Sequence, residues 1–353
     1  MLCGGVLAGK RVTSKDVADH AGVSRTTVSF VLNKVDGVQI SAETRKRVFE
    51  SAQELGYVPY AAAQSLASGR SKVIGLILSR SSRHIASDAY LTQILDGLTT
   101  QCHRYGMQLL LEIAENDHSP DRYLNLVSSK RIDGIIFSGP REDDLALQRL
   151  YDDGFPTVLM GKLPNTQFCY VDIDNQTASF NAVKHLIDHG HNKIACITNA
   201  SLSYHAANER LQGYKQALSV SGIDVNDNYI RYGDFDPESG YFQMENLLKN
   251  GSKPSAVFVA SDVVALGAMT SIREHGLSIP KDIALVGFDD VLMAKYVDPP
   301  LTTIRLPVLK MAQIAIDMVV QLINGNEPDD SQVLLDTEMI IRQSSFLKME
   351  VDK

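Results

Sequence analysis

Cysteine is scarce in this sequence, and long apolar runs are absent. The four cysteines, at positions 3, 102, 169 and 196, are not spaced as metal ligands or as a redox pair, so the last three are expected to be buried thiols. No stretch approaches the ~20 apolar residues of a membrane span, and the N-terminal residues lack the basic lead and apolar core of a signal peptide. We therefore expect a cytoplasmic protein in which residues 1–11 form a disordered leader.

Patterns typical of enzymes and metal sites are also missing. The sequence has no glycine-rich phosphate loop, no paired catalytic carboxylates and no nucleophile elbow. His185 and His189 are four residues apart, with His191 close by, but no third carboxylate or cysteine completes a metal site. We interpret these histidines as helix-surface and C-cap groups, and expect neither an enzyme nor a cofactor nor a metal.

Basic residues are unevenly distributed along the chain. Residues 9–72 hold ten Lys/Arg and six Asp/Glu, a balance of +4, although the whole chain has a formal net charge of −8. The remainder therefore has a balance of −12. A basic head on an acidic body is typical of a small DNA-binding module attached to another domain.

The 353 residues are enough for two or three folding units. Beyond residue 72, apolar runs that suit parallel strands buried on both faces alternate with amphipathic helical patterns. The expected strands are 73–78, 108–112, 134–137, 157–160, 193–198, 256–259 and 283–287. The expected helices are 89–105, 120–129, 178–189, 207–221, 239–249 and 263–275. This alternation predicts two doubly wound α/β subdomains, with a ligand cleft beyond the strand ends.

Residues 12–33 have the pattern of a helix-turn-helix. Thr13 or Ser14 can cap a first helix, Gly22 makes the turn, and the hydroxyl of Ser24 can cap a second helix. Val28, Val31 and Leu32 would form the buried stripe of the second helix, which leaves outward Arg25, Thr26, Ser29, Phe30 and Asn33. Such a face suits base edges and phosphates, with Arg25 able to bind guanine in bidentate fashion. An ordinary pair of capped surface helices is the alternative.

A third helix is expected from a cap at Ser41 to a stop at Gly56. Its inward side chains would be Val48, Phe49, Ala52 and Leu55. Lys46 and Arg47 would face outward, where contact with DNA phosphate and simple solvation are equally open.

After Pro59, the stretch 60–68 is too short to be a stable helix alone in water. Leu66 is its large apolar residue among small ones, and apolar side chains can wedge between base steps of the minor groove. A helix that folds on DNA and an ordinary linker helix remain open on these grounds.

Several ordered motifs resemble the LacI/GalR repressor family, from Val12 to about Ser345. The most specific are Val17-Ala-x-x-Ala-Gly-Val-Ser-x-x-Thr-Val-Ser29, Leu55-Gly-Tyr-x-Pro59, Ala63-Gln-Ser-Leu66, Gly287-Phe-Asp-Asp290 and Pro299-Pro-Leu-Thr-Thr303. The resemblance implies a helix-turn-helix domain at 12–58, a hinge helix and linker at 59–71, and an effector-binding and dimerisation core at 72–353. That core would resemble a periplasmic binding protein, with one subdomain at about 72–174 and 307–332 and the other at about 175–306 and 333–353.

The resemblance also implies a dimer, or a tetramer, on a palindromic operator, with Leu66 inserted at its centre. The expected DNA-binding residues are Thr13, Ser14, Ser24, Arg25, Thr26, Thr27, Ser29, Phe30, Asn33, Tyr57, Gln64 and Leu66. Phe30 departs from the polar or basic residue that relatives often carry there; it would contact a thymine methyl or pack against the head. The loop 34–39 is also slightly longer than in some relatives, which leaves phosphate contacts there open.

The cleft between the subdomains would hold the effector. Placement selects six residues: Tyr90 and Leu91 at a helix start, Ser261 and Asp289 after strand ends, Phe235 in a loop before a helix, and Arg210 on a helix whose neighbours look buried. Carboxylates and an Arg around an aromatic ring suit a polyhydroxylated ligand. The resemblance carries Arg210 and Asp289 onto effector positions and Phe235 onto a stacking ring of purine-type relatives.

Nearby acidic residues have simpler interpretations. Asp234, Asp236 and Ser239 can be helix caps, Asp262 can cap the following helix, and Asp290 can be a loop carboxylate.

From the head motifs and the cleft residues together, we expect a repressor controlled by a sugar-like effector. A purine or other metabolite acting as corepressor is the alternative, and a solute-binding protein or an enzyme with a DNA-binding head is less favoured.

Overall fold

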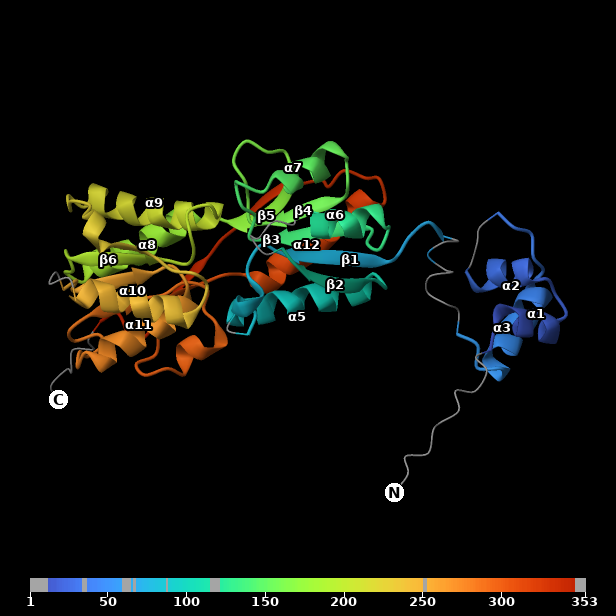
Figure 1. Cartoon of the computed structure of the whole chain (residues 1–353), viewed down its shortest axis with the longest axis horizontal. Coiled ribbons are helices and arrows are strands. Elements are labelled where there is room, and N and C mark those ends of the chain that lie inside the picture. The colour runs from blue at the N-terminus through green and yellow to red at the C-terminus, as the bar shows by residue number, and fades with distance from the viewer. Residues whose placement is uncertain are drawn as a thin grey trace, which may run out of the picture. The chain divides into compact units, whose positions relative to one another are not determined.

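The computed structural model describes residues 12–33, 37–58, 65, 68–86, 88–114, 121–249 and 253–346. The chain divides into two compact units (Figure 1). The first ends at Lys72 and also takes in Lys130–Ile132, and the second holds Val73–Ser129 and the chain from Asp133 onward. The expected leader at 1–11 and most of the expected hinge at 59–71 lie outside the described residues.

The first unit holds three short helices: α1 (Ser14–Ala21), α2 (Arg25–Leu32) and α3 (Ala42–Glu54). Each helix follows a capping hydroxyl, since the side chains of Thr13, Ser24 and Ser41 accept hydrogen bonds from first-turn amides. Of the two candidates for the first cap, Thr13 is the one used. Gly22 ends α1 with φ 65°, a left-handed conformation that other residues rarely adopt. The predicted helix-turn-helix is confirmed.

A small apolar core joins the three helices. Val17, Val28, Val31 and Val48 are each at most 1% exposed, so the predicted inward faces of α1 and α2 are largely confirmed. Phe49 was expected in this core, but its side chain is 47% exposed. Adjacent helical residues differ by about 100° in direction, and α3 turns Val48 and Ala52 inward, so Phe49 is directed away from them.

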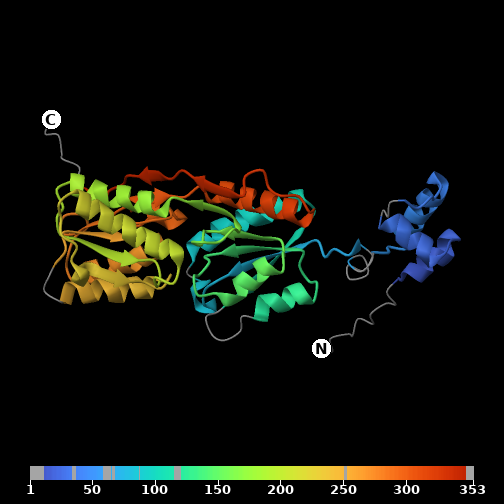
Figure 2. The ribbon, with the colours of Figure 1, turned by 90° about the horizontal axis from the view of Figure 1, so that it is seen from above.

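The second unit has two lobes, seen side by side in Figure 2. The first lobe is built on a six-stranded sheet in the order β11-β5-β4-β3-β1-β2, whose strand pairs are all parallel. Its strands are β1 (Val73–Leu78), β2 (Gln108–Ile113), β3 (Gly134–Ser138), β4 (Thr157–Met160), β5 (Cys169–Ile173) and β11 (Gln332–Leu335). Its helices are α5 (Ala89–Arg104), α6 (Asp121–Ser128), α7 (Leu145–Asp152) and α12 (Val308–Ile323). Helices α5 and α12 pack against each other on one face of the sheet (Figure 1).

The second lobe has a four-stranded parallel sheet in the order β7-β6-β8-β9. Its strands are β6 (Ile194–Thr198), β7 (Ile230–Tyr232), β8 (Ala256–Val259) and β9 (Ala284–Val286). Its helices form two packed pairs: α8 (Asn175–Asp188) with α9 (His205–Val220), and α10 (Pro237–Lys249) with α11 (Asp262–Glu274). Figure 1 shows the two pairs on opposite faces of this sheet. The predicted pair of α/β subdomains is confirmed.

The chain crosses between the lobes after β5, after β10 (Thr303–Arg305), and between β11 and β12 (Glu338–Ile340). Strands β10 and β12 pair antiparallel as a small separate sheet. Because β11 pairs with β5, the last crossing lies after Leu335 rather than after residue 332 as expected. The apolar strands were predicted to be buried on both faces. Edge strand β2 is an exception, because its Leu111 is 38% exposed. No helix among the described residues is long and apolar enough to cross a membrane.

Candidate functional site

The outward face of α2 has the expected composition. Arg25 and Thr26 are exposed, whereas Ser29, Phe30 and Asn33 are half-buried. The Asn33 side-chain amide donates to Ser29 Oγ at 3.1 Å, so these two groups hold each other in place. Phe30 is not part of the apolar cluster that forms the described core of the head. Residues four positions apart share a helix face, so Phe30 lies on the same side of α2 as Thr26.

Several expected DNA-binding residues have local structural roles. The Thr13 side chain and Asp16 form a capping box, with the Thr13 amide donating to Asp16 Oδ2 at 2.7 Å. Ser24 Oγ accepts from the Thr27 amide at 3.0 Å and lies 2.9 Å from Thr27 Oγ1. Tyr57 packs half-buried against the head core, and Ser14 begins α1. Gln64 and Leu66 lie outside the described residues.

A cavity lies between the two lobes of the second unit. It is lined by Tyr90 from the first lobe and by Arg210, Phe235, Ser261 and Asp289 from the second, so five of the expected effector residues meet there. Leu91 does not line the cavity: its side chain is 3% exposed in the apolar core, and its amide donates to Asp88 Oδ1 at 2.9 Å. As the third residue of α5, Leu91 points back into the lobe while Tyr90 faces the cavity.

Arg210 is fixed by a set of contacts in the second lobe. Its Nε donates to Asn175 Oδ1 at 2.9 Å and its NH1 to the Ala260 carbonyl at 2.7 Å. The guanidinium carbon lies 3.8 Å from the centre of the Phe288 ring. Asp289 Oδ1 is 3.6 Å from Arg210 NH1, which places a charge pair at the cavity wall. A guanidinium held this way is a preorganised donor for a ligand oxygen.

Asp289 has an unusual backbone conformation and a raised pKa. Its φ of 113° lies in the region that L residues rarely adopt, and Phe235 has φ 59°. Strained backbone of this kind concentrates at functional sites. Burial raises the pKa of Asp289 to about 6, although Arg210 and a hydrogen bond from Ser261 act in the opposite direction. With a pKa of about 6, this carboxyl is mostly ionised at pH 7 and can accept a hydrogen bond from a ligand hydroxyl.

The sequence interpretation missed several polar residues that line the same cavity. Arg80 pairs with Asp88 in a buried ion pair, and Asp172, Asn175 and Asn199 add buried polar side chains. Burial raises the pKa of Asp172 to about 6. The ends of β1, β5 and β6 position Arg80, Asp172 and Asn199, so the signal that could have found them is the rule that open α/β sheets bind ligands at strand carboxyl ends.

Two buried polar atoms of the cavity wall have no hydrogen-bond partner among the described residues: Arg80 Nε, a donor, and Asn199 Oδ1, an acceptor. Unmatched buried polar atoms are costly in a folded protein unless a ligand or water satisfies them. Phe235 is next to this donor, since the Arg80 guanidinium lies 4.7 Å from the centre of its ring. The Tyr204 ring contacts the Phe235 ring edge-on at 4.9 Å. The cavity therefore combines an aromatic surface with unmatched polar groups.

The contacts of three nearby acidic residues, Asp236, Asp262 and Asp290, show what each of them does. Asp236 Oδ1 accepts from the Ser239 amide at 2.7 Å, as expected of a cap. Asp262 is fully buried and accepts from Thr303 Oγ1 at 2.6 Å and from the Val291 amide at 3.0 Å. Burial raises the pKa of Asp262 well above its usual range. Asp290 pairs with Arg305 and Arg342 at 2.7 and 2.6 Å. Asp262 and Asp290 therefore hold the loop around Asp289 in shape.

The three neighbouring histidines of the second lobe engage protein groups. His185 Nε2 lies 2.9 Å from Ser345 Oγ, and His191 Nδ1 lies 3.1 Å from Ser255 Oγ. His189 follows α8 as its C-cap residue, with Nδ1 2.7 Å from the His185 carbonyl. Burial lowers the pKa of His185 to about 4. These contacts fit helix-surface and capping roles.

Comparison with known proteins assigns both parts of the chain. Residues 13–60 match bacterial regulatory proteins of the lacI family, and residues 183–345 match the periplasmic binding protein-like domain. The HTH-type transcriptional regulator CelR of Thermobifida fusca is 33% identical over 338 residues, which span 95% of this chain and 98% of that protein. The HTH-type transcriptional repressor PurR of Pasteurella multocida is 34% identical over 335 residues, with 94% and 98% covered.

Solved structures give the same result. A Lac repressor dimer bound to operator and the anti-inducer ONPF aligns with a TM-score of 0.83 at 30% identity, covering 96% of this chain and all of that one (100%). A CelR–cellobiose complex aligns with a TM-score of 0.73 at 32% identity, covering 95% and 100%. The chain belongs to the LacI family and is a helix-turn-helix transcriptional regulator with a periplasmic-binding-protein-like effector core.

Proposed function

We propose that this regulator is a repressor controlled by a neutral sugar or sugar derivative that binds between the two lobes. The observation that carries this proposal is the composition of the cavity wall. Buried carboxylates, a fixed guanidinium, and amide and guanidinium atoms without hydrogen-bond partners line the same cavity as the Phe235 ring. Sugars present hydroxyl groups at their edges and apolar C–H faces, which such a wall complements.

The charges at the cavity favour a neutral ligand over a sugar phosphate or a sugar acid. The cations that line it in the described part of the chain are Arg80, Lys162 and Arg210. Each faces a carboxylate: Arg80 pairs with Asp88, Lys162 lies 2.7 Å from Glu209, and Arg210 lies 3.6 Å from Asp289. Because each of these cations already has an acidic partner, the wall offers little unbalanced positive charge to an anionic effector.

A purine base is the second candidate effector. The Phe235 ring is an observation in its favour, because a flat base stacks well on an aromatic side chain. The similarity to PurR repressors points the same way. A purine base has few hydrogen-bond donors, however, so several buried carboxylates of this wall would have no ligand donor to accept from.

DNA binding would use α2 in the major groove and Leu66 in the minor groove of a palindromic operator, with the chain as a homodimer. The exposed Arg25 and Thr26 support this arrangement, together with the similarity to the operator-bound Lac repressor dimer. Ligand binding between the lobes would change their closure and, through the hinge, the affinity for operator.

A thermal-shift screen of the full-length protein tests the effector class. Neutral mono- and disaccharides, sugar phosphates and purine bases form three separate arms, because a ligand that binds only the folded state raises the melting temperature. We expect a concentration-dependent rise in the neutral-sugar arm alone. A rise only with purines would replace the sugar by the corepressor alternative, and a rise only with phosphates would contradict the charge argument.

The variant Asp289→Asn should abolish that thermal shift while operator binding persists. The substitution keeps the shape of the side chain but removes a carboxylate that would accept hydroxyl hydrogen bonds. Operator gel shifts and the melting temperature without ligand serve as controls for folding. An undiminished ligand response in this variant would remove Asp289 from the effector site.

A further inference from the structure

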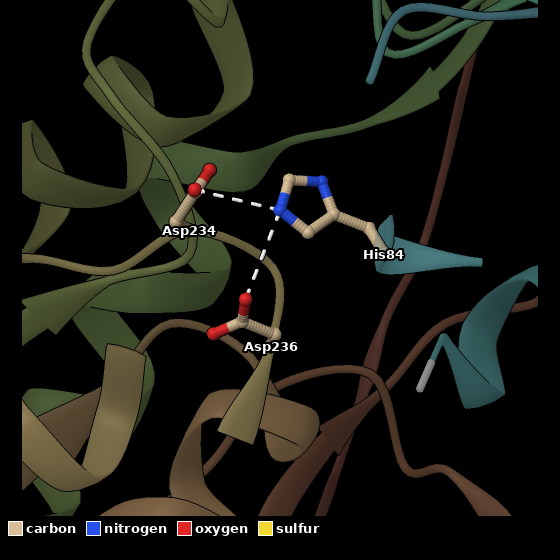
Figure 3. A group of neighbouring side chains, drawn as sticks. All are labelled: His84, Asp234 and Asp236. Atoms are coloured by element: carbon tan, nitrogen blue, oxygen red, sulfur yellow. Dashed lines mark ion pairs between the residues drawn. The ribbon is translucent and has the colours of Figure 1, made fainter. Parts of the chain in front are cut away.

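A second group of ligand-type atoms lies beside the effector cavity. His84 Nε2, Asp234 Oδ2 and Asp236 Oδ2 converge, as Figure 3 shows. His84 Nε2 is 3.4 Å from Asp234 Oδ2 and 3.8 Å from Asp236 Oδ2, and all three atoms lie within 4.8 Å of one another. Phe235, which lines the cavity, separates the two aspartates in sequence, and its ring centre is 5.8 Å from that of His84.

The three residues come from both lobes. His84 ends the short 3₁₀ helix η1 (Ser82–His84), on the segment that joins β1 to α5 in the first lobe. Asp234 and Asp236 lie on the loop between β7 and α10 in the second lobe. Any ion bound by all three would therefore connect the lobes beside the effector.

The separations suit a small tetrahedral ion. Zinc bonds to His nitrogen and carboxylate oxygen of about 2.0–2.1 Å place tetrahedral ligand atoms about 3.4 Å apart. The His84–Asp234 separation has this value, at 3.4 Å, and the His84–Asp236 separation exceeds it by a few tenths of an ångström, at 3.8 Å. A small movement of His84 relative to the second lobe would adjust the two histidine separations, and rotation of the two carboxylates would adjust the third.

The surroundings of these residues resemble a supporting shell. Asp236 Oδ1 accepts from the Ser239 amide at 2.7 Å, which fixes the carboxylate and leaves Oδ2 directed at His84. His84 is only 3% exposed, so its ring has little freedom to turn away. Partners that orient ligand side chains are a regular part of metal sites.

Arg83 is the cation that contacts Asp234 and His84 in this structure. Its NH2 pairs with Asp234 Oδ2, and its Nε donates to His84 Nε2 at 3.1 Å. The Arg83 side chain is 66% exposed, so it can leave toward solvent when a cation takes its place. Ion pairs of exposed side chains contribute little to stability, and this one is a weak competitor for a divalent ion.

We propose that His84, Asp234 and Asp236 bind one divalent transition-metal ion such as Zn²⁺, with water completing the coordination, and that this ion clamps the two lobes at the effector cavity. The imidazole ligand selects Zn²⁺ or Co²⁺ over Mg²⁺ and Ca²⁺, which prefer oxygen ligands alone. The effect of the clamp on effector affinity rests on the proposed function, whereas the metal site itself does not.

Titration of the chelator-treated full-length protein with Co²⁺ tests the site, because tetrahedral Co²⁺ has a visible absorption band. One equivalent should bind to the wild type in the presence of excess Mg²⁺. The variants His84→Gln and Asp236→Asn should each bind at least about tenfold more weakly, since loss of a supporting partner alone costs a metal site that much. Asp234→Asn is the further variant if His84→Gln does not fold.

Two matched controls separate this site from other histidines and from the ion pair. Arg83→Ala should bind Co²⁺ as tightly as the wild type or more tightly, because a competing cation is gone. His189→Gln, at the residue that caps the C-terminus of α8, should leave the titration unchanged. Wild-type affinity in both His84→Gln and Asp236→Asn, or loss of binding in His189→Gln, would overturn the proposal.

Hydrogen exchange with and without Zn²⁺ tests the clamp. Residues 82–86 and 233–239 should both exchange more slowly when the ion is bound. Protection of 233–239 alone would overturn the link between the lobes. The sugar thermal-shift screen, run without metal, reports on the proposed effector separately, so the failure of one proposal is distinguishable from the failure of the other.

Discussion

Arg25 is an exposed guanidinium at the start of α2, on the outward face of the helix-turn-helix. Val28 and Val31 point into the head core, which fixes the rotation of the helix and leaves Arg25 and Thr26 outward. A bidentate bond from Arg25 to guanine O6 and N7 would read one base pair.

We therefore expect Arg25→Ala to lose about 1–3 kcal/mol of binding free energy at one operator position, and to relax the preference there. Binding to a panel of single-base operator variants measures this. If the variant weakens binding equally for every sequence, Arg25 contacts phosphate instead. Lys46→Ala is the comparison, because its exposed ammonium would give uniform weakening if it contacts DNA at all.

The cavity residues show which parts of a site a sequence reveals. Arg210, Phe235 and Asp289 were predicted because they follow recognisable motifs or loop positions, and all three line the cavity. Arg80 and Asp88 were missed because they are eight residues apart in the sequence, outside any long helix or strand. No periodic pattern predicts the ion pair that they form. Leu91 was included because it neighbours Tyr90, although consecutive helical residues point in different directions.

At the scale of the elements, the Thr13 cap is a clear case of a residue with two possible roles. Its side chain accepts from the Asp16 amide at 3.4 Å, and the Asp16 carboxylate accepts from the Thr13 amide at 2.7 Å. Thr13→Ala removes the capping oxygen and should destabilise α1 by about 0.5–2 kcal/mol.

Hydrogen exchange of the α1 amides in the full-length protein measures this loss. Thr13→Asn retains a capping oxygen and should restore protection. If both variants protect α1 like the wild type but bind operator weakly, Thr13 acts on DNA rather than as a cap.

The stretch 59–71 holds Leu66, the residue expected to enter the minor groove. Leu66→Ala should weaken operator binding and reduce the bend of the DNA, because the wedge between base steps is lost. Gel-shift affinity and circular-permutation bend assays measure the two effects. An unchanged affinity together with an unchanged bend would leave an ordinary linker. Ser65→Ala is the matched control at the neighbouring position, where no wedge is expected.

Elements with a local signal were predicted, and elements that depend on distant partners were not. Strands β1, β4 and β8 were predicted with their observed bounds, because each is a short apolar run buried within a sheet. Helix α12 was missed because it is apolar on most sides, packed against both the sheet and α5. Strands β10 and β12 are three residues each and pair across more than 30 positions, which no local pattern encodes.

At the scale of the whole effector core, the lobes are held together beside the cavity by direct contacts. Tyr204 in the second lobe donates its hydroxyl to the Ser79 carbonyl of the first at 2.6 Å. The Glu142 amide donates to the Ser203 carbonyl at 3.1 Å, and His205 Nδ1 lies 2.8 Å from Glu142 Oε1. In the proposed function, a ligand that alters the spacing of these groups would shift the closure of the two lobes.

Burial of carboxylates in the cavity also makes the stability of the core depend on pH. Burial is the main cause that raises the pKa of Asp172 to about 6, with a smaller contribution from Glu209. The same carboxyl titrates near about 3.9 in the unfolded chain. The folded state therefore binds this proton more tightly, so the contribution of Asp172 to stability is greatest below about pH 4 and is lost as the pH rises through about 6.

Asp172→Asn removes that dependence. The free energy of unfolding of the variant, minus that of the wild type, should rise by about 2–3 kcal/mol between pH 4 and pH 7, from a shift of about two pKa units. Urea unfolding at both pH values measures it. Asp174→Asn is the matched control: although burial opposes it, hydrogen bonds from Thr177 hold the pKa of Asp174 below its usual value, so its difference should not rise. Equal differences for Asp172→Asn at the two pH values would mean that this carboxylate stays ionised in the folded core.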